Sequence, residues 1–175
     1  TDSPEMMLNR PDKIIVRYGA ENFEGPPKFV VKLQKKKTGK DYLVNVWRSD
    51  VITAKGGHDT GLFGRIERSE IPWMVVDLDH DPTIDFDTVA VEFTNDHCCG
   101  PGGSDSGDRN LFIEWVKVGR TLFLAQDGKQ VSGCKNGNRN PGLLYCSGMV
   151  KMSQGENIIQ EKTAPSYQEN QLVVE

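Results

Sequence analysis

The sequence predicts an all-β sandwich. Segments in which apolar and polar residues alternate with a period of two recur along the chain, as expected for half-buried strands. Clear examples are residues 28–33, 41–47, 88–94 and 111–116. Turn residues, mostly glycine, proline, asparagine and aspartate, separate these segments. The sequence shows neither a long helical pattern nor an internal repeat, so strands and turns account for the fold.

The first half of the chain contains three expected strands. Residues 13–18 form the first, and a turn-rich connection at 19–27 leads to the second at 28–33. Residues 41–47 follow the break at Gly39, which predicts a hairpin with the second strand. Trp47 lies within this third strand, and we expect it to pack in the core rather than to stack on a sugar.

The middle of the chain combines loops with acidic residues. The glycine-rich loop 55–64 carries His58, which we interpret as an ordinary loop histidine, with a neutral histidine facing a sugar diol as the alternative. Residues 70–78 are predicted to form a strand with Pro72 at its beginning, where the missing N–H does least harm. Six ionisable residues follow within a short run: Asp77, Asp79, His80, Asp81, Asp85 and Asp87. A solvated turn before strand 88–93 is expected there, and a second metal or a general acid and base are the alternatives.

The last part of the chain returns as strand 121–125 after a tight turn at Gly119 and Arg120. A polar loop then runs from Cys134 to Cys146, and beyond residue 153 the pattern fades. We therefore expect a lead-in at 1–11, one β-sandwich domain at 12–152, and an extended tail or linker at 153–175.

Bulk properties exclude several classes of protein. With 175 residues, 37% of them apolar, the chain has room for one domain with its own core. A formal net charge of -4 argues against a nucleic-acid partner. One basic cluster, Lys35–Lys37 with Lys32 and Lys40, is interpreted as a solvated hairpin tip, with a polyanion site as the alternative. The sequence has no apolar run long enough for a membrane span, and its start at Thr1 suggests a secreted, extracellular protein whose leader has been removed.

The most informative stretch is the loop between strands 88–94 and 111–116. Between Asn95 and Asn110 it contains four glycines and three carboxylates, Asp96, Asp105 and Asp108. Calcium takes roughly six to eight oxygen ligands, and glycines let backbone carbonyls turn toward the ion. Such residues also make ordinary solvated turns. The segment beginning at Asp108 leads without a break into a strand, however, which favours a fixed site. The spacing does not match the twelve-residue helical calcium loop.

These residues resemble a known family, the calcium-dependent xylan-binding carbohydrate-binding modules of plant-cell-wall hydrolases. The resemblance lies in Phe93-Thr-Asn-Asp96 and in Gly107-Asp-Arg-Asn-Leu-Phe-Ile-Glu-Trp-Val116. Residues 13–24 and 28–33 also look like the family's first strand, acidic turn and second strand. The similarity covers about residues 12 to 120. It implies a jelly-roll β-sandwich of two antiparallel sheets with binding loops at one end, in which bound calcium contacts adjacent sugar hydroxyls.

Carried over residue by residue, the resemblance implies a set of calcium ligands and a set of residues around them. Asp96 and Asp108 would supply side-chain ligands, and Gly107 a backbone carbonyl. Glu21 or Glu24 of the first turn could contribute to a calcium site, and either could equally be a surface carboxylate. The residues expected to orient the site or contact the ligand are Asn95, His97, Arg109 and Asn110.

The loop is longer here than in the resembled modules. Eleven residues, His97 to Gly107, separate the two aspartates, where the family commonly has a handful. The extra residues include Asp105, which could replace a family ligand or help to shape a different sugar surface.

Four cysteines, Cys98, Cys99, Cys134 and Cys146, allow three disulfide pairings. A zinc site is the alternative, but adjacent Cys98 and Cys99 lack the two-residue spacer that lets two thiolates hold one tetrahedral ion. We expect disulfides, which implies an oxidising compartment. Pairing the first two cysteines with the last two would tie the long loop to the segment that follows it.

The sequence thus predicts a calcium-dependent, lectin-like protein that binds polysaccharide, with calcium as its cofactor and no enzymatic activity. A secreted calcium-binding matrix or biomineral-associated protein with extracellular matrix partners is the alternative. A glycoside hydrolase would need two carboxylates about 5–10 Å apart, which the sequence cannot place. The chain lacks a nucleophile elbow, a phosphate loop and a zinc-hydrolase helix.

Overall fold

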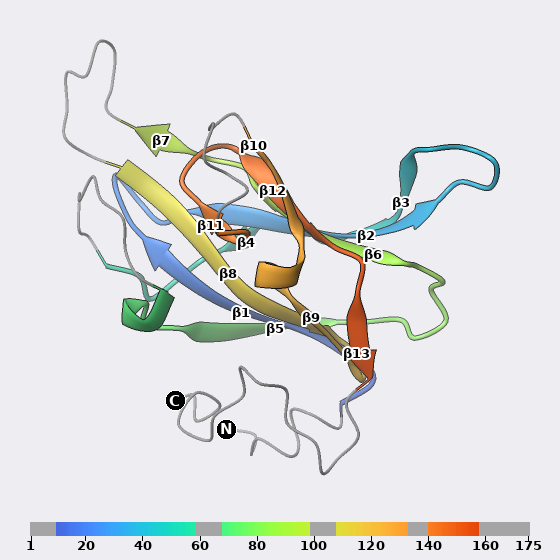
Figure 1. Cartoon of the computed structure of the whole chain (residues 1–175). Coiled ribbons are helices and arrows are strands. Elements are labelled where there is room, and N and C mark those ends of the chain that lie inside the picture. The colour runs from blue at the N-terminus through green and yellow to red at the C-terminus, as the bar shows by residue number, and fades with distance from the viewer. Residues whose placement is uncertain (1–9, 59–67, 99–107, 133–139, 158–175) are drawn as a thin grey trace.

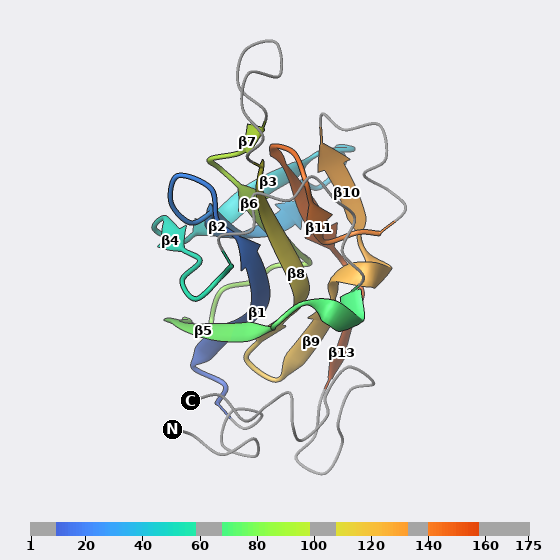
Figure 2. The same ribbon diagram turned by 90° about the vertical axis from the view of Figure 1, so that its left-hand side faces the viewer.

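The computed structural model describes residues 10–58, 68–98, 108–132 and 140–157 (Figure 1). Over these ranges the chain forms two antiparallel sheets packed face to face, which confirms the predicted all-β sandwich. The connections between strands therefore lie at the two opposite ends of the sandwich (Figures 1 and 2). Among these residues, no helix is long and apolar enough to cross a membrane.

The first sheet runs in the order β13-β9-β8-β1-β5, and β7 and β11 also pair with β8. Its strands are β1 (Lys13–Glu21), β5 (Met74–Asp79), β7 (His97–Cys98), β8 (Asp108–Val118), β9 (Thr121–Leu124), β11 (Leu143–Leu144) and β13 (Gly155–Asn157). The second sheet runs in the order β10-β12-β6-β2-β3, and β4 pairs with β2. Its strands are β2 (Lys28–Lys36), β3 (Leu43–Arg48), β4 (Ile52–Thr53), β6 (Thr88–Phe93), β10 (Lys129–Ser132) and β12 (Gly148–Met152).

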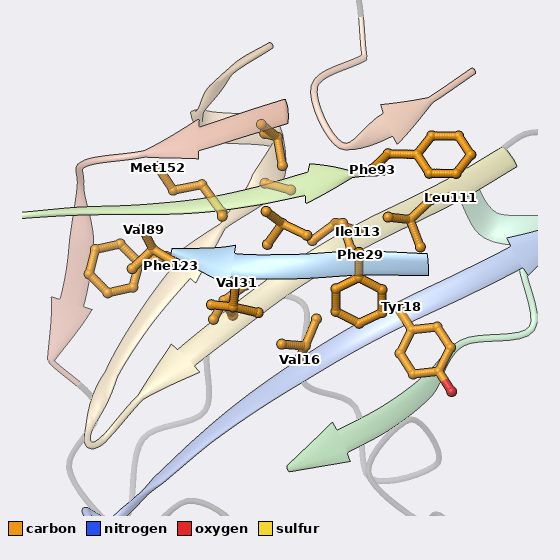
Figure 3. Close-up of a cluster of buried hydrophobic side chains, with 14 of the residues drawn as sticks. Val16, Tyr18, Phe29, Val31, Val89, Phe93, Leu111, Ile113, Phe123 and Met152 are labelled. Carbon is orange, nitrogen blue, oxygen red and sulfur yellow. The ribbon is translucent and has the colours of Figure 1, made fainter. Parts of the chain in front are cut away.

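The hydrophobic core lies between the two sheets. Figure 3 shows its side chains converging from both layers, with Val16 and Ile113 from one sheet and Val31 and Phe93 from the other. These four side chains are at most 1% exposed. Trp47 packs against this core from β3, as predicted. Burial of apolar surface between the sheets fixes the register of the strands that reach the candidate site.

Strand β8 departs from simple alternation. Its register on β1 shifts between Arg17, which faces Trp115, and Tyr18, which faces Ile113, so Glu114 is an extra residue in a β-bulge. Ile113 and Val116 therefore both face the central core. Simple alternation along residues 111–116 predicts instead that Trp115 lies on the same face as Ile113. Trp115 is nevertheless buried, at 1% exposed. At the bulge, Glu114 pairs with Arg17 through a 3.0 Å contact between Arg17 Nε and Glu114 Oε1.

Two other segments differ from the sequence-based expectation. Residues 68–70 form a short 3₁₀ turn and β5 begins only at Met74, so Pro72 precedes the strand rather than opening it. Proline cannot donate to the ladder, which explains the later start. Beyond residue 153, in the segment expected to be a tail, β13 pairs with β9 and extends the first sheet.

Candidate functional site

The candidate site lies where the end of β1 meets the start of β8. The two strands are antiparallel, with Glu21 paired to Asn110, so these two positions share one edge of the sandwich. β7 pairs with the first residues of β8 at the same end, His97 facing Arg109 and Cys98 facing Asp108 (Figures 1 and 2). Residues from distant parts of the sequence are therefore neighbours.

The side-chain amide of Asn110 donates hydrogen bonds to two carboxylates. Its Nδ2 donates to Oε1 of Glu21 at 3.0 Å and to Oδ2 of Asp108 at 2.9 Å. All three side chains are buried, Glu21 at 4%, Asp108 at 7% and Asn110 at 0% exposed. Burial of a carboxylate is costly unless the charge is paired, and the amide of Asn110 is the group that these two carboxylates share.

Four buried side-chain oxygens at this end of the sandwich have no hydrogen-bond partner among the groups the structure describes. They are Oδ1 of Asn22, Asp96, Asp108 and Asn110. A buried acceptor without a partner costs about 1–3 kcal/mol, and such atoms are uncommon in folded proteins. All four are carboxylate or amide oxygens, the ligand types that calcium prefers. The donor set therefore fits a hard divalent cation.

The electrostatics of Asp96 and Asp108 support the same interpretation. Burial raises the pKa of Asp96 above its usual value, although it accepts backbone hydrogen bonds from Ser147 and His97. Burial also raises the pKa of Asp108, and the negative charges of Asp96 and Glu21 raise it further. This mutual repulsion shows that the three carboxylates lie within one electrostatic neighbourhood. A bound cation would reverse the penalty by favouring their charged forms.

Arg109 holds the backbone segments around the site in place and is not one of the candidate ligands. Its guanidinium donates to the carbonyl oxygens of Phe23 (Nη2, 2.6 Å), Glu24 (Nη2, 2.9 Å) and Asn95 (Nη1, 2.6 Å). The side chain therefore binds the β1–β2 turn to the segment after β6. Glu24 adopts a left-handed backbone conformation, with φ of 51°, which non-glycine residues rarely occupy. The fork of Arg109 stabilises that conformation because several carbonyls converge on one planar group.

Asn95 also holds the β1–β2 turn in place. Its Oδ1 accepts a 2.6 Å hydrogen bond from the backbone N–H of Lys28, and its Nδ2 donates to the carbonyl of Pro26 at 3.1 Å. Both ends of the amide are thus used to hold the turn before β2. Phe23, within the same turn, stacks on the ring of His97 with centroids 5.0 Å apart.

A further loop packs beside the end of β1. The backbone N–H of His58 donates to the carbonyl of Ala20 at 3.2 Å, and that of Asn22 donates to the carbonyl of His58 at 2.6 Å. Asn22 Nδ2 also donates to the carbonyl of Gly57 at 3.3 Å. A Cβ on Gly57 would lie 2.4 Å from the carbonyl oxygen of Ala20, so only glycine permits this approach.

The structure therefore brings together most of the residues singled out in the sequence, and it adds two. Glu21, Asp96, Asp108 and Asn110 gather at this end of the sandwich, whereas Glu24 is exposed in the turn. Gly107 and Asp105 lie outside the described residues. The sequence did not predict Asn22 and Phe23 as site residues. Their positions directly after Glu21 were the feature of the sequence that could have indicated them. Within the described ranges, no group of three or more His, Cys, Asp or Glu side chains is placed so that it could hold a metal ion, so the candidate ligands include the amide oxygens of Asn22 and Asn110.

Cys146 immediately precedes Ser147, which contacts Asp96 of the candidate site. It is disulfide-bonded, and its neighbour Ser147 donates a backbone hydrogen bond to Asp96. The side chain of Cys98, together with Cys99 and Cys134, lies outside the described residues, so the predicted pairing stays a prediction.

The acidic run before β6 is used differently. Asp79 pairs with Lys13 at 2.6 Å, and Asp85 pairs with Lys35. Asp81 accepts hydrogen bonds from both the backbone N–H and the hydroxyl of Thr83. These carboxylates serve separate ion pairs and a turn, as expected of a solvated segment.

No protein-family model matches the sequence, and no curated protein sequence matches it significantly.

Two solved structures are similar to this chain, both at 16% sequence identity and both covering 81% of it. One is a selenomethionine form of vCBM60, described in a study of two families of calcium-dependent carbohydrate binding modules, with a TM-score of 0.41 and 90% of its own length covered. The other is vCBM60 in complex with galactobiose, with a TM-score of 0.43 and 98% covered. At this sequence identity and these TM-scores, the similarity assigns neither a family nor a function to this chain.

Proposed function

We propose that the protein is a calcium-dependent carbohydrate-binding protein that recognises polysaccharide through sugar hydroxyls coordinated to bound calcium. The observation that carries the proposal is the set of buried, unpartnered oxygens of Asn22, Asp96, Asp108 and Asn110. These oxygens meet the chemistry of a hard cation, and no donor among the described residues satisfies them. Glu21 and the backbone carbonyl of Gly107 are the next ligands in the proposal, with Asp105 as the residue specific to the long loop.

Calcium would supply a coordination shell that two adjacent hydroxyls can enter in place of water. The chain's own residues would hold the carboxylates in place, since Asn110 bridges Glu21 and Asp108 while Arg109 fixes the turn beside them. The ring of Phe23, stacked on His97, would offer an apolar face beside the sugar. Recognition would then depend on orientation of a diol rather than on bond cleavage.

The test is isothermal titration with calcium, followed by a glycan array in calcium and again in chelator. Wild type should bind calcium and retain glycans only in its presence, while Asp96→Ala and Asp108→Ala should lose both activities. Unchanged calcium and glycan binding in both variants would remove the proposal.

A second candidate is a secreted calcium-binding structural protein of an extracellular matrix. The disulfide at Cys146, typical of oxidising compartments, favours an extracellular location for either function. Incubation with plain polysaccharides separates the candidates. Reversible calcium-dependent retention supports the lectin-like function, calcium binding without retention supports the matrix function, and release of sugar products would indicate a hydrolase.

A further inference from the structure

The β2–β3 hairpin concentrates positive charge in an acidic protein. Residues 32–48 contain six basic side chains and one acidic side chain, Asp41, whereas the whole chain carries a formal net charge of -4. In Figure 1 this hairpin projects from the end of the sandwich opposite β7. Such a separation of charge creates a local positive potential that the net charge conceals.

Most of these cations are not neutralised within the protein. Lys32 pairs with Glu92 at 2.8 Å and Lys35 pairs with Asp85. Lys36, Lys37, Lys40 and Arg48 are exposed, and among the described residues none of them forms an ion pair. Four charges therefore remain available to an external partner.

Apolar side chains lie among these charges. Tyr42 is 50%, Val44 37% and Val46 41% exposed, and they are among the few large apolar residues exposed in the described ranges. The Nζ of Lys37 lies 5.7 Å from the centroid of the Tyr42 ring. An exposed ring beside ammonium groups can contact the C–H face of a sugar while the lysines pair with its acidic groups.

The local geometry disfavours two other partners. The shift in register between β2 and β3 leaves Val46 as a bulge on the outer strand of its sheet, and bulges and lysines both oppose edge-to-edge pairing with a second copy. The tip of the hairpin, residues 37–41, consists of lysine, threonine, glycine and aspartate. A membrane-inserting tip would need apolar residues there.

We infer that the β2–β3 hairpin is a second binding surface, specific for polysaccharides that carry carboxylate or sulfate groups. The inference rests on the proposed function only in choosing a polysaccharide as the partner. β2 has nine residues, with Lys28 bonded to Asn95 at one end and Lys36 at the other. At about 3.3 Å per residue the two surfaces are about 26 Å apart. One polymer chain could therefore contact both, which raises avidity beyond that of either surface.

The experiment measures binding of the full chain to polygalacturonate, dextran sulfate and neutral dextran, all in chelator so that the calcium site does not contribute. The test variant is Lys36→Gln/Lys37→Gln/Lys40→Gln. Its matched control is Lys55→Gln/Lys129→Gln/Lys151→Gln, which removes the same charge from other parts of the surface. Wild type should bind at least one of the two anionic polymers and not neutral dextran. The hairpin variant should bind about tenfold more weakly, because it loses up to three exposed ion pairs with the polymer, and the control should stay within about twofold of wild type.

Several results would overturn the inference. These are failure of wild type to bind either anionic polymer, equal loss in both triple variants, or no loss in the hairpin variant. Binding to phosphatidylserine vesicles or polyglutamate as tight as to the anionic polysaccharides would overturn the choice of partner. Loss of calcium-dependent glycan binding in the Asp108→Ala variant, measured separately, tests the other surface alone.

Discussion

Replacement of Asp108 by asparagine separates a cation-binding role from a structural role. The substitution keeps the shape of the side chain, and an amide oxygen can still accept the hydrogen bond from Nδ2 of Asn110. It removes a buried charge whose pKa is raised by burial and by neighbouring carboxylates. In chelator we therefore expect Asp108→Asn to be as stable as wild type or more stable, by up to about 2 kcal/mol. Above the folded-state pKa the wild type bears the full cost of this charge, and the cost disappears as the pH falls below the unfolded-state pKa.

In calcium, wild type should instead be more stable than Asp108→Asn. At a concentration one hundred times the dissociation constant, a ligand that binds only the folded state stabilises it by about 2.7 kcal/mol. A variant with hundredfold weaker affinity gains about 0.4 kcal/mol at the same concentration. Urea denaturation in calcium and in chelator measures both values, with exposed Asp127→Asn as the charge-matched control. Equal stabilisation of wild type and Asp108→Asn by calcium would contradict the proposed site, and so would a large loss of stability of the variant in chelator.

Three further perturbations follow from the geometry. Arg109→Lys keeps the charge but loses the planar fork, so we expect it to lose about 2–4 kcal/mol of stability together with calcium affinity, whereas Arg120→Lys in an exposed turn should change neither. Gly57→Ala would push a Cβ to within 2.4 Å of the Ala20 carbonyl, so titration calorimetry should show weaker calcium binding, and an unchanged affinity would show that Asn22 is not a ligand. Lys117 is buried and its pKa is lowered to about 8, mainly by burial. The unfolded chain then binds more protons between about pH 8 and 10.5, and wild type should gain up to about 3 kcal/mol over that range. Lys117→Met should gain less in the same denaturation series, and parallel pH profiles for the two proteins would refute the assignment.

The sequence was sufficient for most of the longer strands, because a strand that faces a core alternates with a period of two. It gave no such signal for β10, β12 and the short strands β4, β7, β11 and β13. Val89, Val91 and Phe93 reach the central core as their alternation predicts, although Ala90 between them is buried as well. Trp47 packs against the core as the general tendency of strand tryptophans predicts. It was insufficient at Glu114, where an extra residue in β8 exchanges the faces of the residues that follow. A bulge depends on the partner strand, so alternation within one strand does not reveal it.

The candidate site was predictable in part for a similar reason. Asp96, Asp108 and Asn110 stand at strand ends, which the local pattern locates. Asn22 joins them through the loop at Gly57 and His58, a contact between distant segments that spacing does not encode. The roles of Asn95 and Arg109 in holding the β1–β2 turn also depend on which strands are neighbours.

The bond between Asn110 and Glu21 spans 89 positions of the chain. The oxygens of the candidate site therefore come together only after β1 and β8 have paired, which is a late and slow event for contacts of such separation. An ion held there would have little to bind in a partly folded chain. Calcium should consequently leave the folding rate nearly unchanged and slow unfolding instead, so that its contribution would be to the lifetime of the native protein.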